Sequence, residues 1–278
     1  MRSGLGRLRR RLLREVLLAG GFPRQHFGRV DAAPRDATPK RRVPVLVALW
    51  NRPERIVDVV RMLSEQDADV DIDLYLWNNN RGDHQFYVSE CTRIMAEASI
   101  SGSIRSIVLA RSPINVGSIG RFYWARHLPS VSEPDDIVVV IDDDEDLERD
   151  FVSTALAHAR PDRISAWWSW TVPGDDYWHR TPARLGDQVD HIGPGGAVVP
   201  RPLVAHRRFF TRLPDEYRML DDLWLSAWAR AHGVELAHLP VEISFVLDET
   251  NQFHGQASIK PEFYRALQSA RAREWLSR

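Results

Sequence analysis

Apolar runs and amphipathic stretches alternate along the body of the chain, from residue 43 to about residue 160. The apolar runs are short and rich in β-branched residues, and the run at 137–141 has no polar position, which is typical of a strand covered on both faces. Between them, apolar residues recur at helical spacing. This order predicts an α/β fold with a mostly parallel central sheet flanked by helices. The predicted strands are 43–49, 72–77, 104–110 and 137–141, and the predicted helices are 53–63, 85–98, 117–128 and 151–159.

The two ends of the chain differ from this body. Residues 1–42 carry arginines interleaved with leucines, then two glycines and a stretch rich in Pro, Arg and Asp. We interpret them as a basic amphipathic helix and a linker; the helix either lies on an anionic membrane surface or is a docked or poorly ordered extension. Residues 43–255 form the predicted main domain, in which regularity breaks beyond Pro161, and residues 256–278 form a helical C-terminal tail.

Composition is that of a soluble globular protein: of 278 residues, 44% are hydrophobic and 27% are charged. Lys and Arg number 37 and Asp and Glu 38, so no overall field recruits nucleic acid. A single cysteine, Cys91, excludes an internal disulfide framework and suits a reducing cytoplasm. No apolar run reaches the roughly 18 residues of a spanning helix, and arginines interrupt every early apolar stretch. We therefore expect a cytoplasmic protein, peripheral at the inner face of the membrane if its N-terminal helix binds lipid.

Three consecutive aspartates, Asp142, Asp143 and Asp144, directly follow the most apolar predicted strand. The carboxyl end of such a strand is where an open α/β sheet keeps its ligand crevice. Three carboxylates this close repel one another, so we expect a cation among them; Mg²⁺ or Mn²⁺ takes oxygen ligands and can bridge to phosphate. The alternative is a solvated acidic turn in front of the next helix. The buried strand before the aspartates favours the metal site.

Other polar motifs follow the remaining predicted strands. They are Asn51-Arg52-Pro53-Glu54, Asn78-Asn79-Asn80, Asn115-x-Gly117-x-x-Gly120-Arg121 and, late in the chain, Leu220-Asp221-Asp222. Together with the three aspartates, their order from residue 43 to 254 resembles the nucleotide-sugar glycosyltransferases of the GT-A fold, in particular the inverting family 2. The chain departs from that family at Asn78, where the family has aspartate, and at Asp221, where it has glutamate. The first departure makes a preference for uridine less secure.

The resemblance implies a glycosyltransferase that moves a sugar from a nucleoside-diphosphate sugar to a hydroxyl group, with inversion. It favours a UDP-sugar as the donor, and the acceptor is a carbohydrate, a lipid-linked molecule or another hydroxyl compound. The resemblance also implies a divalent cation, Mn²⁺ or Mg²⁺, that is bound by Asp144, Asp142 and His254. Asp222 aligns with the catalytic base, and Asp221 orients it or contacts the acceptor. The residues that the resemblance assigns to the nucleotide-sugar are Asn51, Arg52, Asn78, Asn79, Asn115, Gly117, Arg121, Asp142, Asp143, Gly195 and Gly196.

Several of these positions also have plain structural explanations. Gly117 suits close approach of backbone to an anion at a helix start, and equally suits tight packing of a helix on a strand. Arg121 suits a charge-assisted bond to phosphate or a surface salt bridge. Gly195 and Gly196 let a donor sugar lie close to backbone, or form an ordinary turn. Each alternative stays open on the sequence alone.

The carboxylates of the late motif have a similar ambiguity. Asp221 and Asp222 precede a predicted helix, where a carboxylate can simply cap the N-terminus, worth about 1 kcal/mol. A carboxylate within hydrogen-bond reach of an acceptor hydroxyl can instead take its proton. His254 is one of ten histidines, and imidazole with carboxylates suits Mn²⁺, although a lone histidine often belongs to the surface or core.

Tryptophans concentrate between the aspartates and the late motif. Residues 166–180 hold four of the ten in the chain. Trp168, Trp170 and Trp178 are predicted to form the wall of an acceptor site, because flat aromatic faces stack on sugar rings. Alternation along a strand would instead send at least one of them into the core.

Two other functions remain open. A nucleotidyltransferase shares sheet architecture and acidic metal ligands, but it usually carries a Gly-rich loop after its first strand, and residues 51–54 contain no glycine. A catalytically silent protein that binds sugars or nucleotides should lose the base or the metal ligands, and both are present in this chain.

Overall fold

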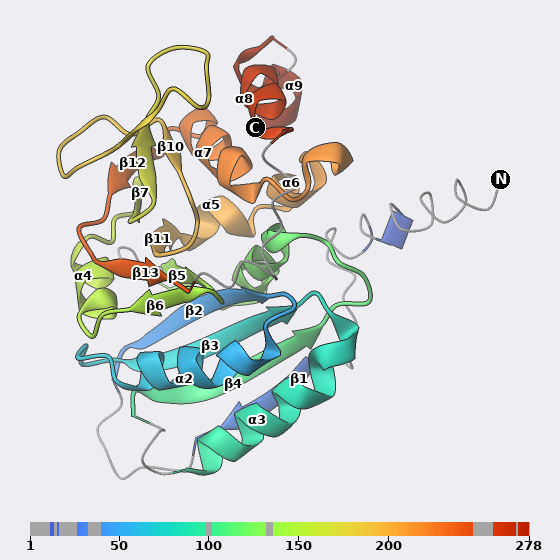
Figure 1. Ribbon diagram of the computed structural model, residues 1–278, viewed down its shortest axis with the longest axis vertical. Helices are drawn as coiled ribbons and strands as arrows, with labels where there is room; N and C mark the ends of the chain where they lie inside the picture. Colours follow the sequence, from blue (N-terminus) through green and yellow to red (C-terminus); the bar gives the residue numbers. More distant parts are fainter. Residues whose placement is uncertain are drawn as a thin grey trace.

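The computed structural model describes residues 12–13, 16, 27–32, 40–97, 102–131, 136–246, 258–270 and 272–277. An eight-stranded sheet runs through its centre (Figure 1). From one edge to the other its strands are β1 (Phe27–Asp31), β4 (Ile104–Arg111), β3 (Asp71–Asn78), β2 (Arg42–Leu49), β5 (Ile137–Asp142), β11 (Ala197–Pro200), β7 (Arg163–Ala166) and β12 (Glu235–His238).

Four neighbouring strands, β4, β3, β2 and β5, run parallel to one another. They confirm the mostly parallel sheet that the apolar runs predicted. Successive residues of β2 face opposite sides, since Leu46 packs into one hydrophobic cluster and Val45 and Val47 into the other. Both faces are therefore covered by apolar side chains, as the uninterrupted apolar run at 137–141 requires.

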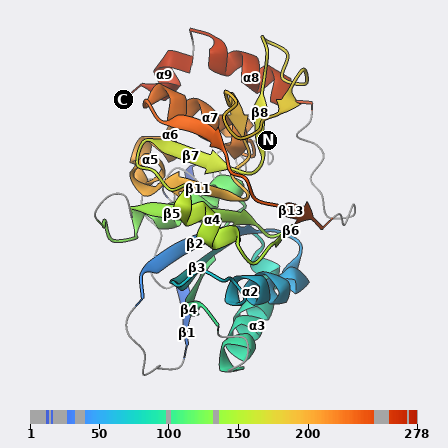
Figure 2. The same cartoon turned by 90° about the vertical axis from the view of Figure 1, so that its left-hand side faces the viewer.

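Helices cover both faces of the sheet (Figures 1 and 2). On one face, Ile56, Tyr87 and Phe151 join the same cluster as Val45. On the other face, Phe122, Trp224 and Phe263 pack with Leu46. The helices of the first face are α2 (Ile56–Ser64), α3 (His84–Ala96) and α4 (Phe151–Ala157). The helices of the second face are η4 (Ser118–Arg126), α5 (Arg201–Ala205), α6 (Arg207–Thr211), α7 (Asp221–Ala231), α8 (Lys260–Gln268) and α9 (Ala272–Leu276). Three short 3₁₀ turns are η2 (Pro53–Arg55), η3 (Arg81–Asp83) and η5 (Asp215–Tyr217).

The order of the parallel strands places a topological switch between β2 and β5. From β2 the chain winds outward through β3 to β4, and then returns to place β5 on the other side of β2. The two strands pair in register, with Val45 opposite Val139 and Ala48 opposite Asp142. In an open α/β sheet, the crevice outside the carboxyl ends at such a switch is the place where ligands bind.

Three segments differ from the sequence-based expectation. Residues 27–31, assigned to a linker, form the edge strand β1, antiparallel to β4. The helix predicted to run to Leu128 is the 3₁₀ helix η4, which packs so tightly on β3 that a Cβ on Gly120 would lie 2.2 Å from the Trp77 indole nitrogen. Residues 260–268 form α8, a helix as predicted for the C-terminal tail, but its Phe263 is fully buried in the core.

The later part of the chain adds short, irregular strands. Strand β11 runs antiparallel to both β5 and β7. A three-stranded sheet consists of β10 (His191–Ile192), β8 (Ser169–Thr171) and β9 (Thr181–Pro182), and a two-stranded one of β13 (Ile243–Phe245) and β6 (Glu145–Leu147). Of these strands, β6 and β13 supply Glu145 and Phe245 to the pocket at the carboxyl ends of β2 and β5.

Most of the predicted N-terminal helix lies outside the described residues, so its interpretation as a membrane-surface or docked helix stays a prediction. Within the part of the chain that the structure describes, no helix combines the length and apolar character needed to span a bilayer.

Candidate active site

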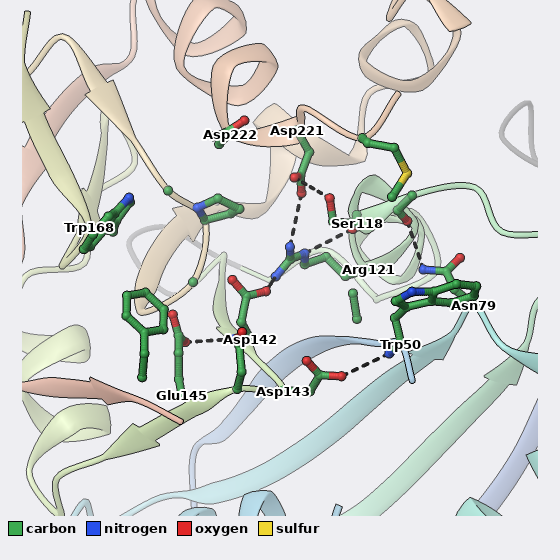
Figure 3. A pocket seen from close by; sticks show the side chains of 18 of the residues that line it. Trp50, Asn79, Ser118, Arg121, Asp142, Asp143, Glu145, Trp168, Asp221 and Asp222 are labelled. Atoms are coloured by element: carbon green, nitrogen blue, oxygen red, sulfur yellow. Dashed lines mark hydrogen bonds and ion pairs between the residues drawn. The ribbon is translucent and has the colours of Figure 1, made fainter. Parts of the chain in front are cut away.

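A pocket of about 490 Å³ opens at the carboxyl ends of β2 and β5. Figure 3 shows Asp142, Asp143 and Glu145 on one side of it and Asp221 and Asp222 on the other. Both acidic motifs that the sequence singled out therefore reach the same cavity. We call the first side the floor and the second side the roof. The remaining lining residues of interest are Trp50, Arg52, Asn79, Asn115, Gly117, Ser118, Arg121, Asp144, Trp168, Trp178, Gly195, Met219, Phe245 and Lys260.

Asp143 is buried in the floor and faces the end of β2. Its carboxylate accepts hydrogen bonds from the backbone N–H of Trp50 at 3.0 Å and from Nη1 of Arg52 at 2.7 Å. Burial raises the pKa of Asp143 to about 7, although Arg52 and the Trp50 N–H act in the opposite direction. These contacts give Asp143 a structural role, and its assignment to the nucleotide-sugar stays a prediction.

Asp144 and Glu145 carry negative charge that is only partly compensated. Nη2 of Arg52 lies 3.2 Å from Asp144, and Glu145 accepts the backbone N–H of Asp142 at 2.8 Å. Burial, followed by the charge of Asp142, raises the pKa of Asp144. The same two causes raise the pKa of Glu145 well above its ordinary value. The floor therefore favours protons or another cation.

Arg121 bridges the floor and the roof (Figure 3). Its guanidinium pairs with Asp142 on one side and lies 3.3 Å from Asp221 on the other, while Nε donates to the Ser118 carbonyl at 3.1 Å. Burial alone would lower the pKa of Arg121, but Asp142 and Asp221 raise it, so the group stays charged. This is a buried bridge and not the surface salt bridge considered above. Contact with a phosphate stays a prediction.

Asp221 and Asp222 begin α7 but differ in their surroundings. The Ser118 hydroxyl donates to Asp221, which also faces Arg121. Burial raises the pKa of Asp221 to about 6 in spite of these partners. Asp222 is ion-paired with Lys260, whose Nζ lies 2.6 Å from Oδ2. Burial acts to raise the pKa of Asp222 as well, but the charge of Lys260 outweighs it, and the pKa falls below its ordinary value.

The Asn and Gly positions of the early motifs hold the loop before η4. Asn79 donates to the Gly117 carbonyl at 3.1 Å and accepts the Val116 N–H at 3.1 Å, and Asn115 accepts the Gly117 N–H at 2.8 Å. Gly117 has φ +88°, and a Cβ there would lie 2.5 Å from the Arg218 carbonyl oxygen, so only glycine fits. Asn79, Asn115 and Gly117 all line the pocket.

Asn51 and Asn78 do not line the pocket. Asn78 is fully buried and accepts the backbone N–H of Asn80 at 2.7 Å. Asn51, at φ 56°, accepts from the side-chain amide of Asn80 at 3.0 Å. These contacts shape the turns after β2 and β3, and donor binding by either asparagine stays a prediction.

The two late glycines have different roles. A Cβ on Gly195 would lie 2.1 Å from Oε1 of Glu145 and 2.5 Å from Oδ2 of Asp142, so this glycine lets backbone lie against the acidic floor. Gly196 is absent from the pocket lining; its φ is +62° and a Cβ would meet Ile243 at 2.3 Å. Gly195 therefore fits a site role, and Gly196 fits a packed turn.

The structure divides the predicted tryptophan wall. Trp168 and Trp178 line the pocket, and the exposed fraction of Trp178 is 50%. Phe245 also lines it, with its ring centroid 5.3 Å from that of Trp168. Trp170 does not line it and lies instead under the guanidinium of Arg180, 4.3 Å from the ring centroid.

The metal prediction rests on Asp142 and Asp144. Among the described residues, no three His, Cys, Asp or Glu side chains are arranged as a ready-made metal site. The predicted ligand His254 lies outside the described residues. His191 is buried beside Asp222, where burial lowers its pKa to about 3. Asp142 and Asp144 both line the pocket and offer carboxylate oxygens, the ligand type that a hard divalent cation prefers, and metal binding there stays a prediction.

Several pocket residues were not assigned a role from the sequence, among them Ser118, Glu145, Phe245 and Lys260. Glu145 had a signal, because it directly continues the run of aspartates. Ser118 lies within the motif Asn115-x-Gly117-x-x-Gly120-Arg121, at one of the positions that the motif does not specify. Lys260 and Phe245 had no local signal, since only the folded chain brings them to the site.

No protein-family model matches the chain, and no curated protein matches it by sequence. Among solved structures, it is similar to residues 1–349 of TarS from S. aureus in complex with UDP, with 13% identity, TM-score 0.47, and coverage of 72% of this chain and 57% of that one. It is also similar to the mannosyltransferase PcManGT from Pyrobaculum calidifontis in complex with GDP-Man and Mn²⁺, with 17% identity, TM-score 0.48, and coverage of 76% and 57%. This chain thus matches little more than half of each. The likeness is distant, and the function has to be argued from the pocket itself.

Proposed function

We propose that this protein is a GT-A-like glycosyltransferase that moves a sugar from a nucleoside-diphosphate sugar to a hydroxyl acceptor. The observation that carries the proposal is one pocket that joins an acidic floor to a separate carboxylate, Asp222, on its opposite side (Figure 3). Glycosyl transfer needs both: charge compensation for a leaving diphosphate, and a base for the attacking hydroxyl. The pocket lies at the switch between β2 and β5, where such folds bind ligands.

The floor is the proposed donor side. Asp144 and Asp142 would hold the divalent cation, Mn²⁺ or Mg²⁺, because their oxygens are hard ligands in a place with excess negative charge. When bound, the cation supplies Lewis-acid neutralisation of the diphosphate. Arg52 keeps Asp143 and Asp144 in place. The absence of a side chain at Gly195 leaves room beside Asp142. A UDP-sugar is the donor we favour, on the motif resemblance alone.

The roof is the proposed acceptor side. Asp222 has a pKa below its ordinary value, so it is ionised at neutral pH and able to accept a proton. A base on the side of the pocket opposite the diphosphate site suits attack with inversion. Trp168 and Trp178 offer aromatic faces to a sugar ring at this end.

Nucleotide binding tests the donor side. Calorimetry with UDP, GDP and dTDP, each with and without Mn²⁺, should show one nucleotide that binds well only with the metal. Asp144→Ala should lower that affinity at least tenfold, because it removes a metal ligand. Undiminished affinity in EDTA would contradict metal dependence, and no binding of any nucleotide would contradict the proposed function. Release of pyrophosphate in place of a nucleoside diphosphate would instead identify a nucleotidyltransferase.

A further inference from the structure

Lys260, the first residue of helix α8, lines the pocket. Its Nζ donates to Oδ2 of Asp222 at 2.6 Å, across 38 residues of sequence. Burial alone would lower the pKa of Lys260, but Asp222 raises it, so the ammonium group stays charged. The pair is largely shielded from water, with exposed side-chain fractions of 25% and 15%. Lys260 belongs to none of the motifs that suggested the function.

The other groups around Asp222 cannot replace this lysine. His191 lies 3.7 Å from Oδ2, and burial keeps it neutral at working pH. Tyr177 accepts from Nη1 of Arg180 at 2.5 Å and lies 3.3 Å from His191, so Arg180 is separated from Asp222 by a phenol. The remaining charges nearby are Asp221 on α7 and Arg230, which acts on His191. Among the described residues, Lys260 is the permanent cation in ion-pair contact with Asp222.

We propose that Lys260 is a positioning residue that holds Asp222 ionised and oriented as the base, an inference that rests on the proposed function. Asp221, next to Asp222 on α7, has no lysine partner and faces Arg121 at 3.3 Å, and burial still raises the pKa of Asp221 to about 6. The backbone N–H of Leu223 holds Oδ1 of Asp222 at 2.8 Å, and Lys260 holds Oδ2. The carboxylate is thereby fixed at both oxygens, in one orientation toward the pocket.

The chain offers a matched control, because α8 has a second polar anchor. The hydroxyl of Tyr217 donates to Glu262 at 2.8 Å, and its ring stacks on Phe263 with centroids 4.1 Å apart. Tyr217→Phe removes the hydrogen bond and keeps the stacking. It weakens the attachment of α8 without removing a group that contacts Asp222.

The experiment measures the pKa of Asp222 in full-length protein labelled with ¹³C-aspartate, with the carboxyl signal assigned by its loss in Asp222→Asn. Lys260→Met removes the charge and keeps most of the side-chain volume. We expect the pKa of Asp222 to rise by at least one unit in Lys260→Met, because burial then acts alone. Lys260→Arg and Tyr217→Phe should stay within about 0.3 units of wild type.

Two results would overturn the inference: no rise in Lys260→Met, or an equal rise in Tyr217→Phe, which would show that any loosening of α8 suffices. With substrates in hand, Lys260→Met should also move the acid limb of the kcat/KM profile upward and lower kcat more than it changes donor KM, and Lys260→Arg should restore both. Calorimetry with UDP and Mn²⁺ on the same samples reports donor binding separately. Failure of UDP, GDP and dTDP alike to bind wild type would count against the proposed function and would leave the measured coupling between Lys260 and Asp222 standing.

Discussion

The floor and the roof of the pocket are both acidic, but their charges are balanced differently. The floor places Asp142, Asp143, Asp144 and Glu145 around two guanidinium groups, Arg52 and Arg121. Burial raises the pKa of the last three of these carboxyls. On the roof, Asp222 is ion-paired with Lys260, and the pKa of Asp222 lies below its ordinary value.

This difference separates two kinds of chemistry within one cavity. A region with unmatched carboxylates attracts a divalent cation and, through it, phosphate. A carboxylate already matched by a lysine gains little from a metal and remains ionised, which suits a base that must accept a proton. Arg121 ties the two regions together, because it contacts Asp142 and Asp221 at once.

The sharpest test of this contrast removes the basicity of Asp222. Asp222→Asn keeps the shape of the side chain, so we expect kcat to fall by roughly 10²–10⁴-fold, the usual contribution of a positioned base, while donor affinity stays unchanged. Asp144→Ala should do the reverse and weaken donor binding first. Steady-state kinetics and nucleotide calorimetry on both variants distinguish the two effects.

A helix cap predicts another outcome for the same substitution. Asparagine caps a helix about as well as aspartate. Activity of Asp222→Asn within about threefold of wild type, at saturating donor and acceptor, would therefore exclude the base role and direct attention to Asp221. Asp221→Asn should have a milder effect that falls mainly on acceptor KM.

The parallel half of the sheet could be predicted because its signal is local. Runs such as 43–49 and 137–141 are apolar at every position, and burial on both faces is what such runs require. The acidic end of β5 could be predicted for the same reason, since the strand fixes where Asp142 must lie. Strand β1 was missed because residues 27–31 mix apolar and charged residues, as an edge strand permits.

The roof was only half predictable because its partners come from distant segments. No residue near Asp222 in the sequence indicates that Lys260 is its partner, and residues 260–268 have the pattern of an ordinary amphipathic helix. The tryptophans show the same limit. Trp168 and Trp170 are two positions apart, yet one lines the pocket and the other lies under Arg180. A ten-residue window cannot tell which face of an irregular strand meets the cavity.

Replacing Arg121 removes the link between the floor and the roof. Arg121→Met leaves the buried Asp221 and the half-buried Asp142 without their shared cation, which should cost about 3–5 kcal/mol in the free energy of unfolding. Urea denaturation at pH 7 measures the loss. Arg93→Met is the control, because Arg93 forms exposed pairs with Glu90 and Glu97 on α3, where ion pairs contribute little. An equally stable Arg121→Met protein would show that the bridge has no structural importance.

The smallest effect expected is in the pH dependence of stability, and it compares the adjacent carboxyls of the roof. Burial raises the pKa of Asp221 from 3.8 to about 6. Its contribution to stability is therefore fully present below pH 4 and is lost as the pH rises to about 6, a loss of about 3 kcal/mol at most. The pKa of Asp222 is lowered, so its contribution is present above pH 4 and is lost only in stronger acid.

Urea unfolding of wild type, Asp221→Asn and Asp222→Asn at pH 4, 5, 6 and 7 tests this contrast. The difference between Asp221→Asn and wild type should shift in favour of the variant as the pH rises from 4 to 6, because the variant has no carboxyl to ionise there. The difference between Asp222→Asn and wild type should stay flat from pH 5 to 7 and change only near pH 4. Parallel curves for the two variants would mean that neighbouring carboxyls share one environment, and that Arg121 and Lys260 do not separate them as the geometry implies.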